Sequence, residues 1–155
     1  MKRKLDKVLG GFLVMLLAIM VFAVLWQVFS RYVMKSPSSI TEELARYLLI
    51  WIGILGAAYA SGQQAHLSIN LLGPKLAENN RKRLRIFINI LIIFFAVCVL
   101  IVGGGQLVLL NMELGQSSAA LKVPLYVVYL VIPLSGLVVT VYKINEIVYS
   151  EKYLV

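Results

Sequence analysis

The distribution of ionisable residues is the feature that most constrains this chain. Four stretches contain no Asp, Glu, Lys, Arg or His: residues 8–30, 47–65, 86–112 and 123–142. They are 23, 19, 27 and 20 residues long. About 20 consecutive apolar residues in a helix cross a hydrocarbon core about 30 Å thick. The pattern therefore predicts an all-α integral membrane protein with four transmembrane helices.

The second predicted span is expected to begin before its uncharged stretch. Ser39 and Glu42 have the S-x-x-E spacing of a helix capping box, and a helix from Ile40 continues into the apolar run. Arg46 lies four residues after Glu42 and three after Glu43, which favours a short amphipathic turn at the outer surface before the span. We expect one membrane domain over residues 1–155. Its predicted spans are about 8–30, 40–65, 86–112 and 123–142.

Composition excludes several classes of protein. The chain has 155 residues, of which 61% are hydrophobic, so little remains for a soluble domain. The net charge of +8 comes from basic residues that flank the spans, where they orient a membrane protein and meet anionic lipids, so nucleic acid is not an expected partner. The run after Lys7 is too long for a signal peptide, and we expect a retained first span. Cys98 is the single cysteine and cannot form an intramolecular disulfide.

Lysine and arginine positions predict the topology. Eleven are expected in the cytoplasm and four on the opposite side, because cytoplasmic loops carry the excess of basic residues. The eleven are Lys2, Arg3, Lys4, Lys7, Lys75, Arg81, Lys82, Arg83, Arg85, Lys143 and Lys152. The four are Arg31, Lys35, Arg46 and Lys122. Both termini are therefore predicted to be cytoplasmic.

The four uncharged stretches contain no Asp, Glu, Lys, Arg or His, which limits the chemistry of the chain. Ion-coupled carriers and proton relays generally need such a group at depth. Small four-span exporters use a carboxylate in the first span, and haem anchors commonly use two histidines, whereas this chain has one histidine. We therefore expect no enzyme activity and no metal or cofactor. One alternative is an autonomous homo-oligomeric transporter with a path lined by Gln27, Asn89 and Gln106. Another is an anchor for a redox enzyme, which predicts co-purifying haem or flavin.

Two sets of residues are candidates for contacts with other molecules. Charges on the side where membrane proteins carry fewest form a candidate docking surface: Arg31, Lys35, Glu42, Glu43 and Arg46. The second set is a candidate interface with another subunit or with lipid, because small residues permit close helix packing and basic residues meet lipid phosphates. Its members are Trp51, Gly53, Gly56, His66, Arg81, Arg83 and Arg85.

Several stretches of the chain resemble one known family. They are Arg-Tyr-Val at 31–33, Ile-Thr-Glu-Glu-Leu-Ala-Arg-Tyr-Leu-Leu-Ile-Trp-Ile-Gly-Ile-Leu-Gly-Ala-Ala at 40–58, His-Leu-Ser-Ile-Asn at 66–70, Ser-Ser-Ala-Ala-Leu-Lys-Val-Pro at 117–124 and Tyr-Leu-Val-Ile-Pro at 129–133. Together they resemble the DctQ family, the small membrane subunit of tripartite ATP-independent periplasmic (TRAP) transporters. Length and four-span topology agree with this family. Ile40 departs from it, since many members have Trp before the Thr/Ser-Glu-Glu sequence.

The resemblance implies a scaffold function in a bacterial inner membrane. In this family a large membrane subunit holds the sodium and substrate sites and moves them like an elevator, while a periplasmic protein captures the solute. The resemblance implies that this chain supports the large subunit and helps to dock the loaded binding protein, with Lys122 and Glu113 joining the docking surface. It implies a carboxylate solute, either a sialic acid or a C4-dicarboxylate, and sodium bound in the partner subunit.

Overall fold

A computed structural model describes the backbone of residues 2–63 and 78–148, and the side chains of residues 4–63 and 83–148. These residues are nearly all helical, which confirms the predicted all-α class. The helices are α1 (Lys2–Tyr32), α2 (Ser39–Gln63), α4 (Glu78–Phe95), the π-helix η3 (Ala96–Gly103), α5 (Gly104–Glu113), α6 (Leu125–Tyr129) and α7 (Val131–Val148).

Four helical stretches among the described residues are long and apolar enough to cross a membrane. They are Lys4–Tyr32, Ser39–Gln63, Arg83–Glu113 and Leu125–Val148, with 29, 25, 31 and 24 residues. The third stretch joins α4, η3 and α5, and the fourth joins α6 and α7. The predicted number of membrane-spanning helices is thus confirmed. The first turn of α2 belongs to the same continuous helix as the second span, because α2 runs without a break from Ser39 to Gln63.

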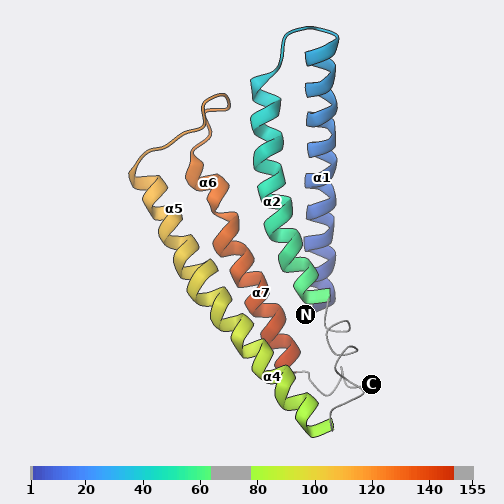
Figure 1. Cartoon of the computed structure of the whole chain (residues 1–155), viewed down its shortest axis with the longest axis vertical. Helices are drawn as coiled ribbons and strands as arrows, with labels where there is room; N and C mark the ends of the chain where they lie inside the picture. The colour runs from blue at the N-terminus through green and yellow to red at the C-terminus, as the bar shows by residue number, and fades with distance from the viewer. Residues whose placement is uncertain (1, 64–77, 149–155) are drawn as a thin grey trace.

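The four spans form a layer that is one helix thick (Figure 1). Helix α1 packs along α2, α2 packs along α7, and the continuous helix of α4, η3 and α5 packs along α6 and α7 on the other side. Successive spans run in opposite directions, so two ends of the molecule collect different segments (Figure 1). We call residues 31–46 and 113–125 the loop end. We call residues 4–7, 83–89 and 142–148 the terminal end.

Side chains within this layer are mostly uncovered by the chain itself. In the most apolar 18-residue window of each span, 17%, 11%, 11% and 33% of the residues are buried, in chain order, so the last span is the most covered. Leu9, Leu55, Val131 and Tyr142 form the buried core between α1, α2 and α7. Large apolar side chains such as Phe22 and Phe94 are 73% and 67% exposed. In a bilayer these faces contact lipid or another membrane protein.

Pro133 lies just after an interruption of the last span. Pro133 has no backbone N–H, and its ring displaces the carbonyl four residues earlier. The structure places the interruption at Leu130, between α6 and α7. Trp51 of α2 holds the chain next to this interruption, because its Nε1–H donates to the Val128 carbonyl oxygen at 3.1 Å. The short helix α6 is therefore fixed against α2 at the loop end.

Two glycines let α7 approach the preceding span closely. A Cβ atom on Gly136 would lie 2.8 Å from the Leu100 Cβ, and one on Gly104 would lie 2.7 Å from the Ile132 Cγ2. Gly103 and Gly104 keep helical dihedral angles, with φ of −64° and −63°. The run Gly103-Gly104-Gly105 therefore continues the helix, and Gly104 permits close packing.

Candidate functional site

The loop end carries most of the charges that the sequence assigned to a docking surface. Arg31 lies in the last turn of α1, Lys35 lies in the loop that follows, and Glu42 and Arg46 lie in the first turns of α2. Lys122 lies in the loop before α6. All five side chains are exposed, as is that of Glu113 at the end of α5. The fold thus brings cations from distant parts of the chain to one end of the molecule.

Glu42 and Arg46 form the ion pair that their spacing predicts. The Arg46 Nη2 donates to the Glu42 Oε1 at 3.3 Å, and the two side chains are 66% and 55% exposed. Exposed pairs of this kind stabilise a helix by only about 0.3 to 0.5 kcal/mol. The pair therefore remains accessible to a partner at little energetic cost.

Glu43 differs from the position expected for it beside Arg46. Its half-buried carboxylate points into the fold, where Oε2 accepts hydrogen bonds from the backbone N–H groups of Ala120 and Leu121 at 2.8 and 2.9 Å. Oε1 accepts a bond from the Tyr47 hydroxyl at 2.8 Å. The sequence spacing within α2 could not reveal this, because the amides come from a loop 77 residues away. Glu43 thus holds the loop within this chain, and its assignment to a docking surface stays a prediction.

The candidate interface residues of α2 fall into two groups. Trp51 is half-buried and packs within the chain, with its ring 6.5 Å from that of Phe12 in an edge-to-face arrangement. Gly53 and Gly56 lie on an uncovered face, where an added Cβ would meet nothing within 4 Å. Only Gly62, further along α2, packs tightly, with the Tyr142 ring 2.8 Å from such an atom. Gly53 and Gly56 are therefore available for contact with another molecule.

The basic residues at the terminal end also separate into two kinds. Arg83 is exposed, whereas Arg85 is 8% exposed and lies against Glu146 of α7, with 3.8 Å between its Nε and Oε1. Glu146 also accepts a bond from the Lys143 Nζ at 3.0 Å. Arg85 therefore differs from the solvated, lipid-facing position expected for the basic run. The sequence pattern did not indicate this buried cluster, because Arg85 and Glu146 are distant in the chain.

Two candidate interface residues have no described side chain. Arg81 lies in α4, but its side chain is outside the described residues. His66 lies outside them altogether. Their assignment to a subunit or lipid interface stays a prediction.

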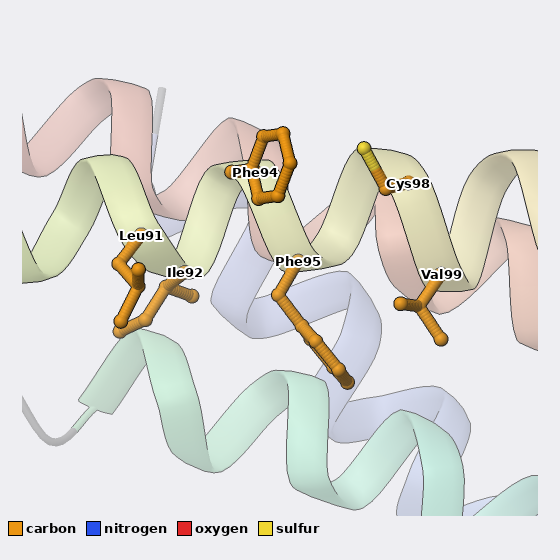
Figure 2. A pocket seen from close by; sticks show the side chains of 6 residues that line it. All are labelled: Leu91, Ile92, Phe94, Phe95, Cys98 and Val99. Atoms are coloured by element: carbon orange, nitrogen blue, oxygen red, sulfur yellow. The ribbon is translucent and has the colours of Figure 1, made fainter.

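The polar residues proposed to line a solute path do not converge within one chain. Gln27 lies on α1, on one side of the layer, whereas Asn89 and Gln106 lie on α4 and α5 on the other side. Asn89 is buried and Gln106 is exposed. One hollow on the α4 and η3 side is lined by apolar residues (Figure 2). These are Leu91, Ile92, Phe94, Phe95, Cys98 and Val99. Among the described residues, no group of three or more His, Cys, Asp or Glu is arranged to hold a metal.

Comparisons with known proteins agree with this architecture. A family model described as "Tripartite ATP-independent periplasmic transporters, DctQ component" matches residues 20–152. A Haemophilus influenzae chain assigned to the TRAP transporter small permeases is 26% identical over 144 residues, which is 93% of this chain and 88% of that protein.

Two other relatives have names that refer to sialic acid. The sialic acid TRAP transporter permease protein SiaT of Haemophilus influenzae is 36% identical over 97 residues, which is 62% of this chain and 15% of that protein. The sialic acid TRAP transporter small permease protein SiaQ of Vibrio cholerae is 29% identical over 88 residues, which is 57% of this chain and 51% of that protein. With the family match over most of its length, this chain belongs to the DctQ component family of the tripartite ATP-independent periplasmic transporters.

Proposed function

We propose that this chain is the fixed scaffold subunit of a sodium-driven TRAP transporter in a bacterial inner membrane. The observation that carries the proposal is the open layer of four spans, in which few residues are fully buried and many large apolar side chains are exposed. A transporter that moves its substrate site like an elevator needs a stationary part to slide against. A broad, thin layer of helices suits that part, because it contacts both lipid and a partner over a large area.

The partner in this proposal is a large TRAP membrane subunit. Support comes from SiaT, in which the region similar to this chain makes up only 15% of the protein. A region similar to this chain is thus joined to a much longer remainder in one permease protein, which supports an association of this chain with a large subunit. The open face of α2 around Gly53 and Gly56 is a suitable contact for the large subunit, because small residues let two helices approach closely in lipid.

We place the loop end in the periplasm and both termini in the cytoplasm. The distribution of eleven basic residues against four supports this orientation. The exposed cations Arg31, Lys35, Arg46 and Lys122 then face the compartment of the solute-binding protein. Docking through complementary charges favours rapid association at modest affinity, which suits repeated delivery of solute. Glu42 stays paired with Arg46 and sets the position of that cation.

The proposed solute is a carboxylate, either a sialic acid or a C4-dicarboxylate. The names of SiaT and SiaQ favour sialic acid, at identities of 36% and 29%. The sodium and solute sites are assigned to the large subunit, and none to this chain. Anionic phospholipids are the other expected partners, through exposed basic residues such as Arg83.

Co-purification tests the proposal directly. The chain is tagged at its carboxyl terminus, native membranes are solubilised in a mild detergent, and the co-purifying proteins are identified by mass spectrometry. We expect a large polytopic membrane protein, with a periplasmic solute-binding protein present or recruited on addition. Recovery of a homo-oligomer of this chain alone would contradict the scaffold function and support an autonomous transporter. Haem or flavin absorbance in the purified sample would instead support an anchor for a redox enzyme.

A further inference from the structure

The carboxylate of Glu43 is the only described side chain that bonds the backbone of the loop between α5 and α6. Oε2 accepts both the Ala120 and the Leu121 amide, at 2.8 and 2.9 Å. The Tyr47 hydroxyl bonds the other oxygen at 2.8 Å and so fixes the orientation of the carboxylate. Hydrogen bonds to a charged acceptor are roughly twice as strong as those between neutral groups. The carboxylate therefore ties this loop to the first turns of α2.

The same loop has its own folded geometry, and Lys122 lies in its second half. The Ser118 N–H donates to the Val123 carbonyl oxygen at 2.9 Å, and the Leu125 N–H donates to that of Gln116 at 2.9 Å. Lys122 has a φ of 54°, a left-handed conformation that residues other than glycine rarely adopt without support from their surroundings. Its neighbours on both sides are hydrogen-bonded, Leu121 to Glu43 and Val123 to Ser118.

Apolar contacts below the carboxylate leave the loop incompletely packed. A hollow of about 210 Å³ lies between α2, α6 and the loop, lined by Leu44, Tyr47, Leu48, Trp51, Leu121, Val123, Val127 and Val128. Since side chains of this chain do not fill this open space, apolar packing contributes less to the position of the loop there. The hydrogen bonds of Glu43 add a polar constraint to those that the loop makes within itself.

We infer that Glu43 is a positioning residue of the docking surface. Its carboxylate holds the backbone of Ala120 and Leu121 so that Lys122 keeps its left-handed conformation and stands at the loop end with Arg46. Glu43 does not touch the partner, and it acts through Lys122. This inference rests on the proposed docking of a solute-binding protein at the loop end.

Adjacent glutamates provide a matched pair of variants for the test. Glu43→Gln and Glu42→Gln make the same chemical change one residue apart, but Glu42 bonds only the exposed Arg46 side chain. Glu43→Ala removes the acceptor completely, whereas Glu43→Gln keeps one acceptor oxygen without the charge. Tyr47→Phe removes the hydroxyl that orients the Glu43 carboxylate and leaves the charges of Glu42 and Glu43 in place.

The first measurement is amide hydrogen exchange of residues 116–125 in the purified membrane complex, reconstituted in lipid nanodiscs. We expect exchange of Ala120 and Leu121 to become roughly tenfold faster in Glu43→Ala. Glu43→Gln and Tyr47→Phe should give smaller increases in the same direction. Glu42→Gln serves as a control for this measurement and should not change the exchange of the loop. Unchanged exchange in Glu43→Ala would overturn the inference.

The second measurement is a titration of the same nanodiscs with the solute-binding protein that co-purifies with the complex. We expect Glu43→Ala to raise the dissociation constant about as much as Lys122→Ala does, and the double variant to show no further increase. Faster loop exchange with an unchanged dissociation constant would overturn the positioning function of Glu43. If Lys122→Ala and the double variant Arg31→Ala and Arg46→Ala also bind normally, docking at this end fails as well, so the two failures can be distinguished.

Discussion

The two ends of the molecule use charged residues in opposite ways. At the terminal end, the side chains of Arg85, Lys143 and Glu146 are about 8 to 11% exposed, and Glu146 pairs with Arg85 of α4 and with Lys143 of its own helix, α7. At the loop end, Arg31, Arg46 and Lys122 are exposed, and Glu43 is the acidic residue that turns inward. A buried ion cluster connects helices, whereas exposed cations are available to a partner. The comparison teaches that one end holds the layer together, whereas the other leaves its cations accessible.

Removing the acid at the centre of the terminal cluster should have the largest effect. Glu146→Ala leaves two buried cations without their shared carboxylate, and breaking a buried pair in this way costs about 3 to 5 kcal/mol of stability. Thermal unfolding of the purified complex in one detergent measures the loss. Glu113→Ala removes an exposed acid from the loop end and should change stability by less than about 0.5 kcal/mol. Equal effects of the two variants would contradict the contrast between the ends.

The close packing of α2 against Tyr142 of the terminal end should be sensitive to a single methyl group. Gly62→Ala places a Cβ atom 2.8 Å from the ring of Tyr142, whose hydroxyl is held by Asp6 at 2.6 Å. Such overpacking costs about 1 to 3 kcal/mol. Gly53→Ala is the matched control on the same helix, because its Cβ atom would meet nothing within 4 Å. Thermal unfolding of the isolated chain should separate the two variants, and a loss of stability in Gly53→Ala alone would reverse the assignment.

Loss of exposed cations at the loop end should weaken docking without changing assembly. The double variant Arg31→Ala and Arg46→Ala should raise the concentration of solute-binding protein at half-maximal uptake roughly three- to tenfold, because rim charges act mainly on association. In the wild type, this half-maximal concentration should rise as salt is added, and in the variant it should rise less. Lys7→Ala removes an exposed cation from the opposite end and should leave docking unchanged. Normal uptake by the double variant at every concentration would refute the docking surface.

The smallest effect is expected for the exposed ion pair of α2. Glu42→Gln removes a pair whose side chains are 66% and 55% exposed, so stability should fall by no more than about 0.5 kcal/mol. Thermal unfolding in low and high salt measures this difference, which should vanish at high salt because ions screen exposed charges. A loss as large as that of Glu146→Ala would show that the loop end also depends on ion pairs for its stability.

Local properties of the sequence predicted the four helices, since the length of an uncharged apolar stretch is sufficient to indicate a span. The ion pair of Glu42 and Arg46 and the interruption before Pro133 also depend on residues that are close together in the sequence. Such local reasoning could not predict the contacts of Glu43, Arg85 and Gly136, because the residues that they contact lie on distant segments of the chain. Glu42 and Glu43 look equivalent within α2, and only the loop at Ala120 and Leu121 distinguishes them. The docking cations were predicted as a group from charge counting, and the fold brings them to one end.

The thin layer of helices has a consequence for biogenesis. In water, a chain with so many uncovered apolar side chains would aggregate, but in a bilayer lipid tails solvate those faces as well as another protein does. The uncovered faces of α1, α2 and α4 therefore carry little penalty before a partner arrives. The core around Val131 and Tyr142 lies within the chain itself. We therefore expect that membrane insertion can precede subunit assembly, so that the supply of one subunit need not be synchronised with that of the other.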